Sequence, residues 1–283
     1  MKTKIFISSS SGLDTIPHQT SITVIPDILV FSGDESYLDG VELDGEALYH
    51  RLRNDKTAKV AIMPQKYTYI EDLLKNAIKN NYERFFFILS TKSNVDYSRL
   101  YERIKEDYSD FDILIYRTNT YAYPMAYVAI TADKLFKDNL DLPLIYSKLD
   151  SISDNFKLYF FSPQEDVYKP IKRIDFDEDI INQAQMGVLS IVDKHGILNV
   201  RKIKNKLPLE QLLGNFLDDI QNISVIPFII YTNRYSAYAE VIENRIMDFY
   251  PKLKGIKRYL LPSSFGNFLG MYSVGVGYIK KEE

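Results

Sequence analysis

The chain has 283 residues, no cysteine and a formal net charge of −3 at pH 7. Without cysteine it forms no disulfide, thiol nucleophile or thiolate metal site. The slightly acidic balance gives no electrostatic basis for binding nucleic acid. The three histidines, His18, His50 and His195, are far apart in sequence, and they match no metal-binding motif.

Length and hydropathy place the chain among globular proteins. At roughly 100–200 residues per domain, the length allows two domains or one large one. No apolar stretch approaches the roughly 20 residues that a membrane span needs. The apolar run at residues 4–7 is better explained by a first strand than by a signal segment. We therefore expect a cytoplasmic protein with no metal and no other cofactor.

The first half of the chain alternates between strand and helix patterns. Predicted strands occupy residues 4–7, 22–30, 84–89 and 112–116, and predicted helices occupy residues 44–53, 68–80, 98–108 and 125–136. The run RFFFIL at 84–89 is apolar throughout, which is typical of a strand buried on both faces of a parallel sheet. Pro26 indicates an edge or a bulge in the second strand. The alternation predicts a doubly wound, mostly parallel α/β domain over residues 1–152.

The pattern changes after Asp138. Predicted strands occupy residues 158–161, 188–192, 197–200 and 225–231, and predicted helices occupy residues 209–220 and 237–249. Between two of these strands, Asp193–Gly196 predicts a hairpin turn. We place the domain boundary in the polar stretch Ser151–Asn155 and predict an α+β domain over residues 153–283.

A junction with the usual form of a ligand site lies at residues 60–78. The sequence VAIMPQKYTYIEDLLKNAI predicts the end of a buried strand or a turn, then Pro64, then an amphipathic helix. Ligands of α/β proteins commonly bind at such junctions. However, Ala61, Ile62 and Met63 carry no side-chain hydrogen-bond donor.

Hydroxyl groups follow two of the predicted strands, at Ser8–Ser11 and at Ser90, Thr91 and Ser93. Both groups are placed to bind an anion, and both are equally typical of side chains that cap the next helix. The tyrosine-rich stretch at 116–127 either frames an apolar pocket or packs against the second domain. The sequence leaves these alternatives open.

Collinear motifs give the chain a family resemblance. They are SSSSGLDTIP from residue 8, ITVIPDILVF from 22, ESYLDGVELDGEALYHRL from 35, AIMPQ from 61, LSTKSNVDY from 89, PIKRI from 170, VLSIVDKHG from 188 and VGVGY from 274. In this order they resemble the DegV family of bacterial fatty-acid-binding proteins. The resemblance covers nearly the whole chain.

The resemblance implies a fatty acid held in an apolar tunnel between two domains. In the family, hydroxyls of a Thr-Ser-Gln-Pro and a Leu-Ser-Gly motif bind the carboxylate, and some members present the acid to a separate fatty acid kinase with the help of an arginine and a histidine. The corresponding residues here are Ala61, Ile62, Met63, Ser93, Asn94, Arg173 and Phe268. Only the arginine is retained unchanged, so the head-group chemistry differs from the family pattern.

Two functions remain open from the sequence. The chain is a non-catalytic carrier of a long-chain fatty acid or related lipid, or it is a degenerate member whose pocket is filled and whose surface binds a protein. Asn94 either replaces a serine hydroxyl or belongs to a turn. Ile62, Met63 and Phe268 either line the tunnel or fill the core, and Arg173 either faces a partner or makes a surface ion pair. We favour the carrier, because the family fold is built around the tunnel.

Overall fold

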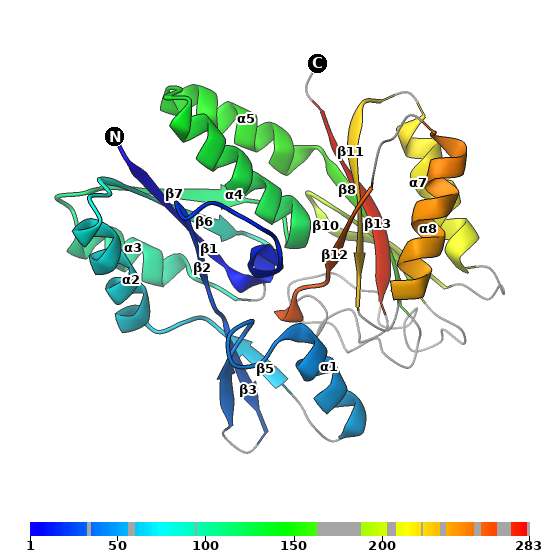
Figure 1. Ribbon diagram of the computed structural model, residues 1–283, viewed down its shortest axis with the longest axis horizontal. Coiled ribbons are helices and arrows are strands. Elements are labelled where there is room, and N and C mark those ends of the chain that lie inside the picture. The colour runs from blue at the N-terminus through cyan, green and yellow to red at the C-terminus, as the bar shows by residue number, and fades with distance from the viewer. Residues whose placement is uncertain are drawn as a thin grey trace. The chain divides into compact units, whose positions relative to one another are not determined.

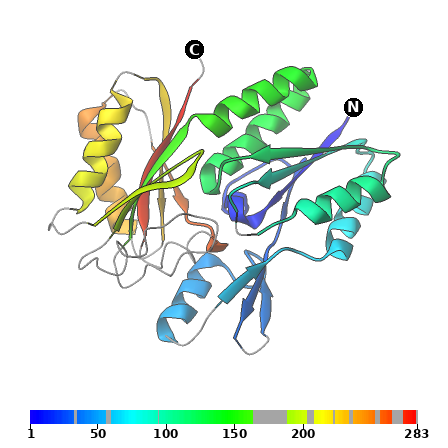
Figure 2. The same ribbon diagram turned by 180° about the vertical axis from the view of Figure 1, so that it is seen from behind.

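The computed structural model describes residues 1–32, 35–55, 60–93, 95–162, 188–202, 208–221, 223–232, 236–251, 256–264 and 273–281. The contacts divide the chain into two compact units, Met1–Ser153 and Asp154–Glu283. Figures 1 and 2 show the helices and strands of each unit from opposite sides. Among the described residues, no helix is long and apolar enough to cross a membrane.

A parallel sheet forms the centre of the first unit. Its strands are β1 (Thr3–Ser8), β2 (Ile22–Ile25), β6 (Arg84–Ser90) and β7 (Asp112–Thr118), in the order β2-β1-β6-β7. All three neighbouring pairs are parallel, which confirms the predicted parallel sheet. The chain passes from β1 to β2 on one side and returns to β6 on the other. The carboxyl ends of β1 and β6 therefore form a topological switch point, where α/β proteins commonly bind ligands.

Helices cover both faces of this sheet (Figure 1). They are α2 (Tyr67–Lys79), α3 (Ser98–Asp107), α4 (Ala122–Lys137) and α5 (Leu142–Asp154). Because side chains alternate along a strand, Phe85 and Phe87 of β6 pack against α2 and α3, while Phe86 faces the other side. The Phe86 ring lies 5.1 Å from that of Phe136 in α4 and 6.2 Å from that of Tyr146 in α5. The sequence pattern does not predict α5, because the polar residues of its last turn resemble a linker.

A small antiparallel sheet extends the first unit. Its strands are β3 (Ile28–Phe31), β4 (Ser36–Leu38) and β5 (Val60–Met63), in the order β4-β3-β5. The single strand expected at 22–30 is wrong, because the chain leaves the parallel sheet at Pro26 and starts β3 in the second sheet. A strand does end before Pro64, as one of the two predicted alternatives, but its predicted burial is wrong. β5 is half exposed, with Ala61 and Met63 facing solvent.

The helix that follows β4 is α1 (Gly45–Asn54). Asp44 is its N-cap, and the Asp44 Oδ1 accepts a hydrogen bond of 2.8 Å from the Ala47 N–H. This bond satisfies one of the free amide groups of the first turn. The helix predicted at 44–53 is confirmed.

The second unit is built on a mixed sheet. Its strands are β8 (Phe156–Ser162), β9 (Val188–Asp193), β10 (Gly196–Lys202), β11 (Val225–Tyr231), β12 (Lys257–Leu260) and β13 (Val274–Lys280), in the order β10-β9-β8-β13-β11-β12. The β11–β12 pair is parallel and the other pairs are antiparallel. Asp193 pairs with Gly196, which confirms the predicted hairpin.

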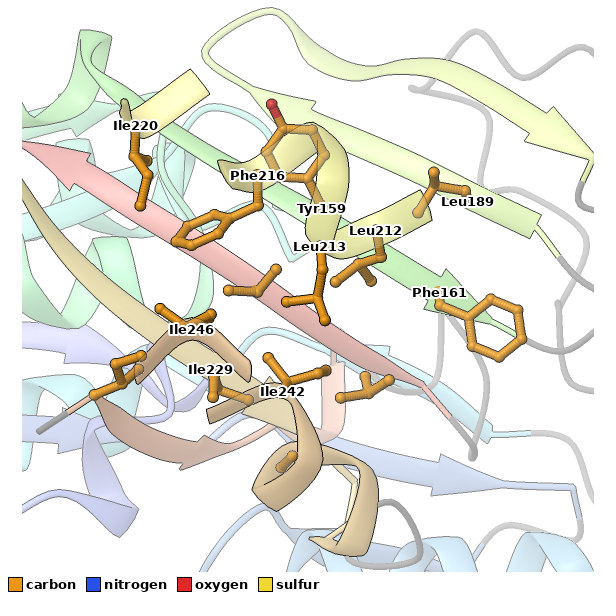
Figure 3. Close-up of a cluster of buried hydrophobic side chains, with 14 of the residues drawn as sticks. Tyr159, Phe161, Leu189, Leu212, Leu213, Phe216, Ile220, Ile229, Ile242 and Ile246 are labelled. Carbon is orange, nitrogen blue, oxygen red and sulfur yellow. The ribbon is translucent and has the colours of Figure 1, made fainter. Parts of the chain in front are cut away.

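Two helices, α7 (Pro208–Ile220) and α8 (Ser236–Phe249), pack on this sheet. Their apolar residues meet the strands in one buried cluster, shown in Figure 3, in which Phe216 of α7 and Ile242 of α8 are fully buried. At the end of α7, Asp219 Oδ2 accepts hydrogen bonds from Lys157 Nζ at 2.6 Å and from the Tyr278 hydroxyl at 3.1 Å. These bonds tie α7 to β8 and β13.

Gly277 gives a test of the packing in this sheet. A Cβ atom at this position would lie 2.6 Å from Phe228 Cζ and 2.7 Å from the Lys157 carbonyl oxygen. Phe228 is fully buried, so neither neighbour has room to move. We expect Gly277→Ala to lower the free energy of unfolding by about 1–3 kcal/mol, measured by urea unfolding followed by circular dichroism.

Gly214 in α7 is the matched control, because nothing lies within 4 Å of the Cβ that an alanine would add. We expect Gly214→Ala to raise stability by about 0.5–1 kcal/mol through helix propensity. Equal unfolding midpoints for the two variants would contradict the packing described at Gly277.

Candidate functional site

Buried serines occupy the carboxyl end of β1. Ser9–Ser11 form a short 3₁₀-helix, closed by Gly12 in the left-handed region at φ 70°. The Ser11 hydroxyl donates to the Ser8 carbonyl oxygen at 2.8 Å. The Ser9 hydroxyl donates to Asp39 Oδ2 at 2.8 Å and accepts from the Asp27 N–H at 3.0 Å. Internal hydrogen bonds thus account for Ser9 and Ser11.

Asp27 is a fully buried carboxyl group at the bend between β2 and β3. Its Oδ1 accepts a hydrogen bond of 2.7 Å from the Tyr97 hydroxyl. Its Oδ2 is buried and has no hydrogen-bond partner among the described residues. Buried polar atoms are nearly always paired, so this oxygen is an exception that needs a physical reason.

Tyr97 and Gln65 connect Asp27 to two other segments. The Tyr97 hydroxyl, which donates to Asp27, accepts from the Gln65 N–H at 3.0 Å. The Gln65 side-chain amide donates to the Pro26 carbonyl oxygen at 3.2 Å. The end of β2, the segment before α3 and the residue that follows Pro64 are therefore held together. We refer to Ser9, Asp27, Asp39, Gln65 and Tyr97 as the Asp27 cluster.

The electrostatics of the cluster favour the protonated form of Asp27. Burial, helped by the charge of Asp39, raises the pKa of Asp27 to about 7, while the hydrogen bond from Tyr97 and the nearby Ser9 hydroxyl and Ser10 N–H oppose the rise. Burial and Asp39 also raise the pKa of Asp14 to about 6. Carboxyl groups perturbed in this way are frequent at functional sites.

Within the described residues, the Asp27 cluster does not provide the donor set of a metal centre. In the part of the chain that the structure describes, no group of three or more histidine, aspartate or glutamate side chains is arranged to hold a metal ion.

Four of the seven residues that the resemblance implies for the ligand site are described. Ala61 and Met63 are exposed, and 49% of the Met63 surface is accessible. Ile62 lies on the other face of β5 and packs against the core under α2 and α3. The Ser93 hydroxyl accepts from the Val95 N–H at 3.1 Å, which is a local turn interaction. Asn94, Arg173 and Phe268 lie outside the described residues.

Polar groups after β6 and β7 bond to one another and to α5. The Thr91 hydroxyl donates to Asn119 Oδ1 at 2.8 Å, and the Asn119 N–H donates to Ser153 Oγ at 2.9 Å. The Tyr116 hydroxyl donates to Asp150 Oδ1 at 2.9 Å, so this tyrosine packs inside the first unit.

Sequence reasoning missed Asp27 and Gln65 as candidate site residues. The available signal was the charge in VIPDILV, where one aspartate interrupts an otherwise apolar run. A charged residue inside such a run is rarely buried unless it is paired or protonated. The partners of Asp27 come from residues 9, 39 and 97, and no local pattern connects these positions.

The fold defines the chain as a two-unit protein with a parallel α/β unit followed by a mixed-sheet unit. Residues 2–164, more than half of the chain, match the family model described as "Uncharacterised protein, DegV family". The chain belongs to the DegV family. A search of curated proteins finds no match.

Solved structures match along the whole chain. A fatty-acid-binding DegV family protein from Streptococcus agalactiae has a TM-score of 0.80 at 16% identity, covering 100% of both chains. A stearic-acid-binding protein from Eubacterium ventriosum has a TM-score of 0.78 at 17% identity, covering 99% of this chain and 98% of the other. DegV, a fatty-acid-binding protein from Bacillus subtilis, has a TM-score of 0.74 at 17% identity, covering 99% of this chain and 100% of the other. At these identities the similarity shows the fold.

Removal of the Tyr97 hydroxyl tests the connection between the segments. Tyr97→Phe leaves Asp27 Oδ1 and the Gln65 N–H without their shared partner, so we expect a loss of about 1–3 kcal/mol in the free energy of unfolding. Tyr67→Phe is the control, because the Tyr67 hydroxyl donates to Asp107 on the exposed surface at 2.6 Å. We expect this control to lose less than about 1 kcal/mol. Urea unfolding measures both variants, and similar losses would contradict a special role for Tyr97.

The pKa of Asp27 predicts a pH dependence of stability. Between about pH 4 and about pH 7 the folded chain keeps the Asp27 proton while the unfolded chain releases it. Raising the pH through this window therefore lowers the free energy of unfolding, by at most about 1.4 kcal/mol per pH unit from this group. The isosteric variant Asp27→Asn lacks this contribution.

We expect the stability of Asp27→Asn relative to the unsubstituted chain to rise from about pH 4 to about pH 7 and then to stay constant. Urea unfolding at a series of pH values measures this difference. A difference that does not change with pH would show that Asp27 ionises normally in the folded chain.

Proposed function

We propose that this protein is a non-catalytic carrier that binds a long-chain fatty acid or a related lipid. The observation that carries the proposal is the match of the whole chain, at a TM-score of 0.80, to a protein described as fatty-acid-binding. Family membership and the similarity to a stearic-acid-binding protein support it. We place the carrier in the cytoplasm.

The proposed ligand site is an apolar tunnel between an N-terminal domain at residues 1–152 and a C-terminal domain at residues 153–283. Its proposed lining includes the residues at the family's motif positions, which are Ala61, Ile62, Met63, Ser93, Asn94, Arg173 and Phe268. Burial of each methylene group contributes about 0.8 kcal/mol. Contact with ten carbons would then contribute about 8 kcal/mol, enough to offset a weaker head-group site.

Delivery of the ligand to a separate fatty acid kinase is the finer part of the proposal. Phe268 stands where the family has a histidine, so we expect this delivery to be impaired relative to other members.

A second candidate function has its own supporting observation. Ile62, which replaces a small polar residue of the family motif, packs against the core under α2 and α3. A larger side chain at this position fits a degenerate member with a filled pocket that acts as a protein-interaction module. The presence or absence of bound lipid distinguishes the two functions.

Native mass spectrometry of the purified protein, followed by organic extraction, tests the carrier. We expect a fatty acid or a related lipid at near-unit stoichiometry. We also expect Ala61→Trp to lower lipid affinity by roughly tenfold or more, equivalent to about 1.4 kcal/mol, because the added ring would occupy the head-group end of the tunnel.

Val41→Trp is the matched control, since Val41 is 69% exposed in the turn after β4. The control should retain the lipid. A protein that stays empty after incubation with excess fatty acid would favour the interaction module instead.

A further inference from the structure

Asp27 Oδ2 is the unexplained polar atom of the Asp27 cluster. It is buried and has no hydrogen-bond partner among the described residues, although the other oxygen of the same carboxyl group is held by Tyr97 at 2.7 Å. Tyr101 presents a second such atom. Its buried hydroxyl also has no partner among the described residues, and its ring stacks on that of Tyr97 at a centroid distance of 5.2 Å.

The position of Asp27 connects it to the proposed head-group site. Ile28, the next residue, pairs with Met63 at the end of β5. Gln65, two residues beyond Met63, donates to the Pro26 carbonyl oxygen. Asp27 therefore lies beside the junction where the residues at the family's hydroxyl positions, Ala61 and Ile62, have no donor of their own.

We propose that Asp27, in its protonated form, donates a hydrogen bond from its free carboxyl oxygen to the carboxylate of the bound fatty acid. The proposal rests on the proposed carrier function and identifies the head-group residue of that site. Two adjacent carboxylates repel one another, and a single shared proton turns this repulsion into a hydrogen bond. Binding then couples to one proton on Asp27, and no covalent bond forms or breaks.

The groups that face Asp27 are consistent with this role. Asp39 acts on it with a charge of the same sign and favours the protonated form, together with burial. Tyr97 donates a hydrogen bond to Asp27 Oδ1, and the Ser9 hydroxyl and the Ser10 N–H lie near the carboxyl group on the β1 side. Burial raises the pKa of the Tyr101 hydroxyl, so this hydroxyl stays protonated. Since the pKa of Asp27 is about 7, the donor is lost just above neutral pH. Oδ2 does not touch solvent, so a head group that reaches it must shift neighbouring side chains.

Isothermal titration calorimetry with dodecanoic acid and with dodecanol, both below their solubility limits, tests the proposal. For the unsubstituted chain we expect the dissociation constant of dodecanoic acid to rise about tenfold per pH unit above about pH 7 and to be constant below it. Titrations at about pH 8 in two buffers of different ionisation enthalpy should show uptake of about one proton per ligand. Dodecanol carries no charge, so its affinity should not change with pH.

Three variants complete the experiment. Asp27→Asn keeps an amide donor at the same place and should bind dodecanoic acid independently of pH. Asp133→Asn, which removes a buried carboxylate that pairs with Lys137 on α4, should keep the pH dependence. Tyr97→Phe removes a hydrogen bond that lowers the pKa of Asp27, so it should move the midpoint of the pH dependence upward. If Asp27→Asn does not fold, the shift of this midpoint in Tyr97→Phe tests whether Asp27 controls the pH dependence of binding.

The outcomes separate this proposal from the carrier function. Binding of dodecanoic acid with no dependence on pH and no proton uptake would overturn the role of Asp27 and leave the carrier intact. Equal loss of dodecanoic acid and dodecanol binding at high pH would also overturn it, since the effect would then not involve the head group. Absence of fatty acid from the purified protein, together with no binding at any pH, would overturn both proposals.

Discussion

The hydrogen bond from the Tyr97 hydroxyl to Asp27 holds together segments that are distant in sequence. Through Tyr97 the end of β2 is joined to the segment before α3, and through Gln65 both are joined to the residue after Pro64. Ser9, which directly follows β1, joins that strand to the same segments, because its hydroxyl accepts a hydrogen bond from the Asp27 N–H and donates one to Asp39. The turn from the parallel sheet into the small antiparallel sheet thus depends on a buried carboxyl group.

A buried carboxyl group is costly to keep ionised, and the surroundings of Asp27 do not remove that cost. Tyr97 satisfies one oxygen, whereas burial and Asp39 disfavour the charge. A protonated carboxyl has a hydrogen-bond donor that a carboxylate lacks. The first unit of this DegV family member therefore combines two properties at one place. β5 carries apolar side chains where the family resemblance implies hydroxyls, and a potential acid donor lies directly beside it.

Local patterns in the sequence predicted those elements whose side chains need only their near neighbours. RFFFIL is apolar on both faces and forms the central strand β6, and Asp44 caps α1 as its position indicates. Patterns failed where distant residues decide the conformation. Pro26 breaks one expected strand into β2 and β3 because β3 finds its partners in β4 and β5. The polar last turn of α5 is helical because Tyr116 and Thr118 of β7 bond to Asp150 and Ser153.

By itself the sequence determined the class of fold, the parallel sheet of the first unit and the family, because apolar periodicity and collinear motifs are properties of the chain alone. Only the tertiary structure decided which polar side chains meet. Asp27 and Tyr97 follow β2 and β6, whose carboxyl ends lie at one edge of the parallel sheet, whereas Asp39 and Gln65 follow β4 and β5 of the small antiparallel sheet. No spacing in the sequence encodes the meeting of these two sheets at Asp27. The pKa of Asp27 follows from the same cause, since burial and the charge of Asp39 exist only after the chain has folded.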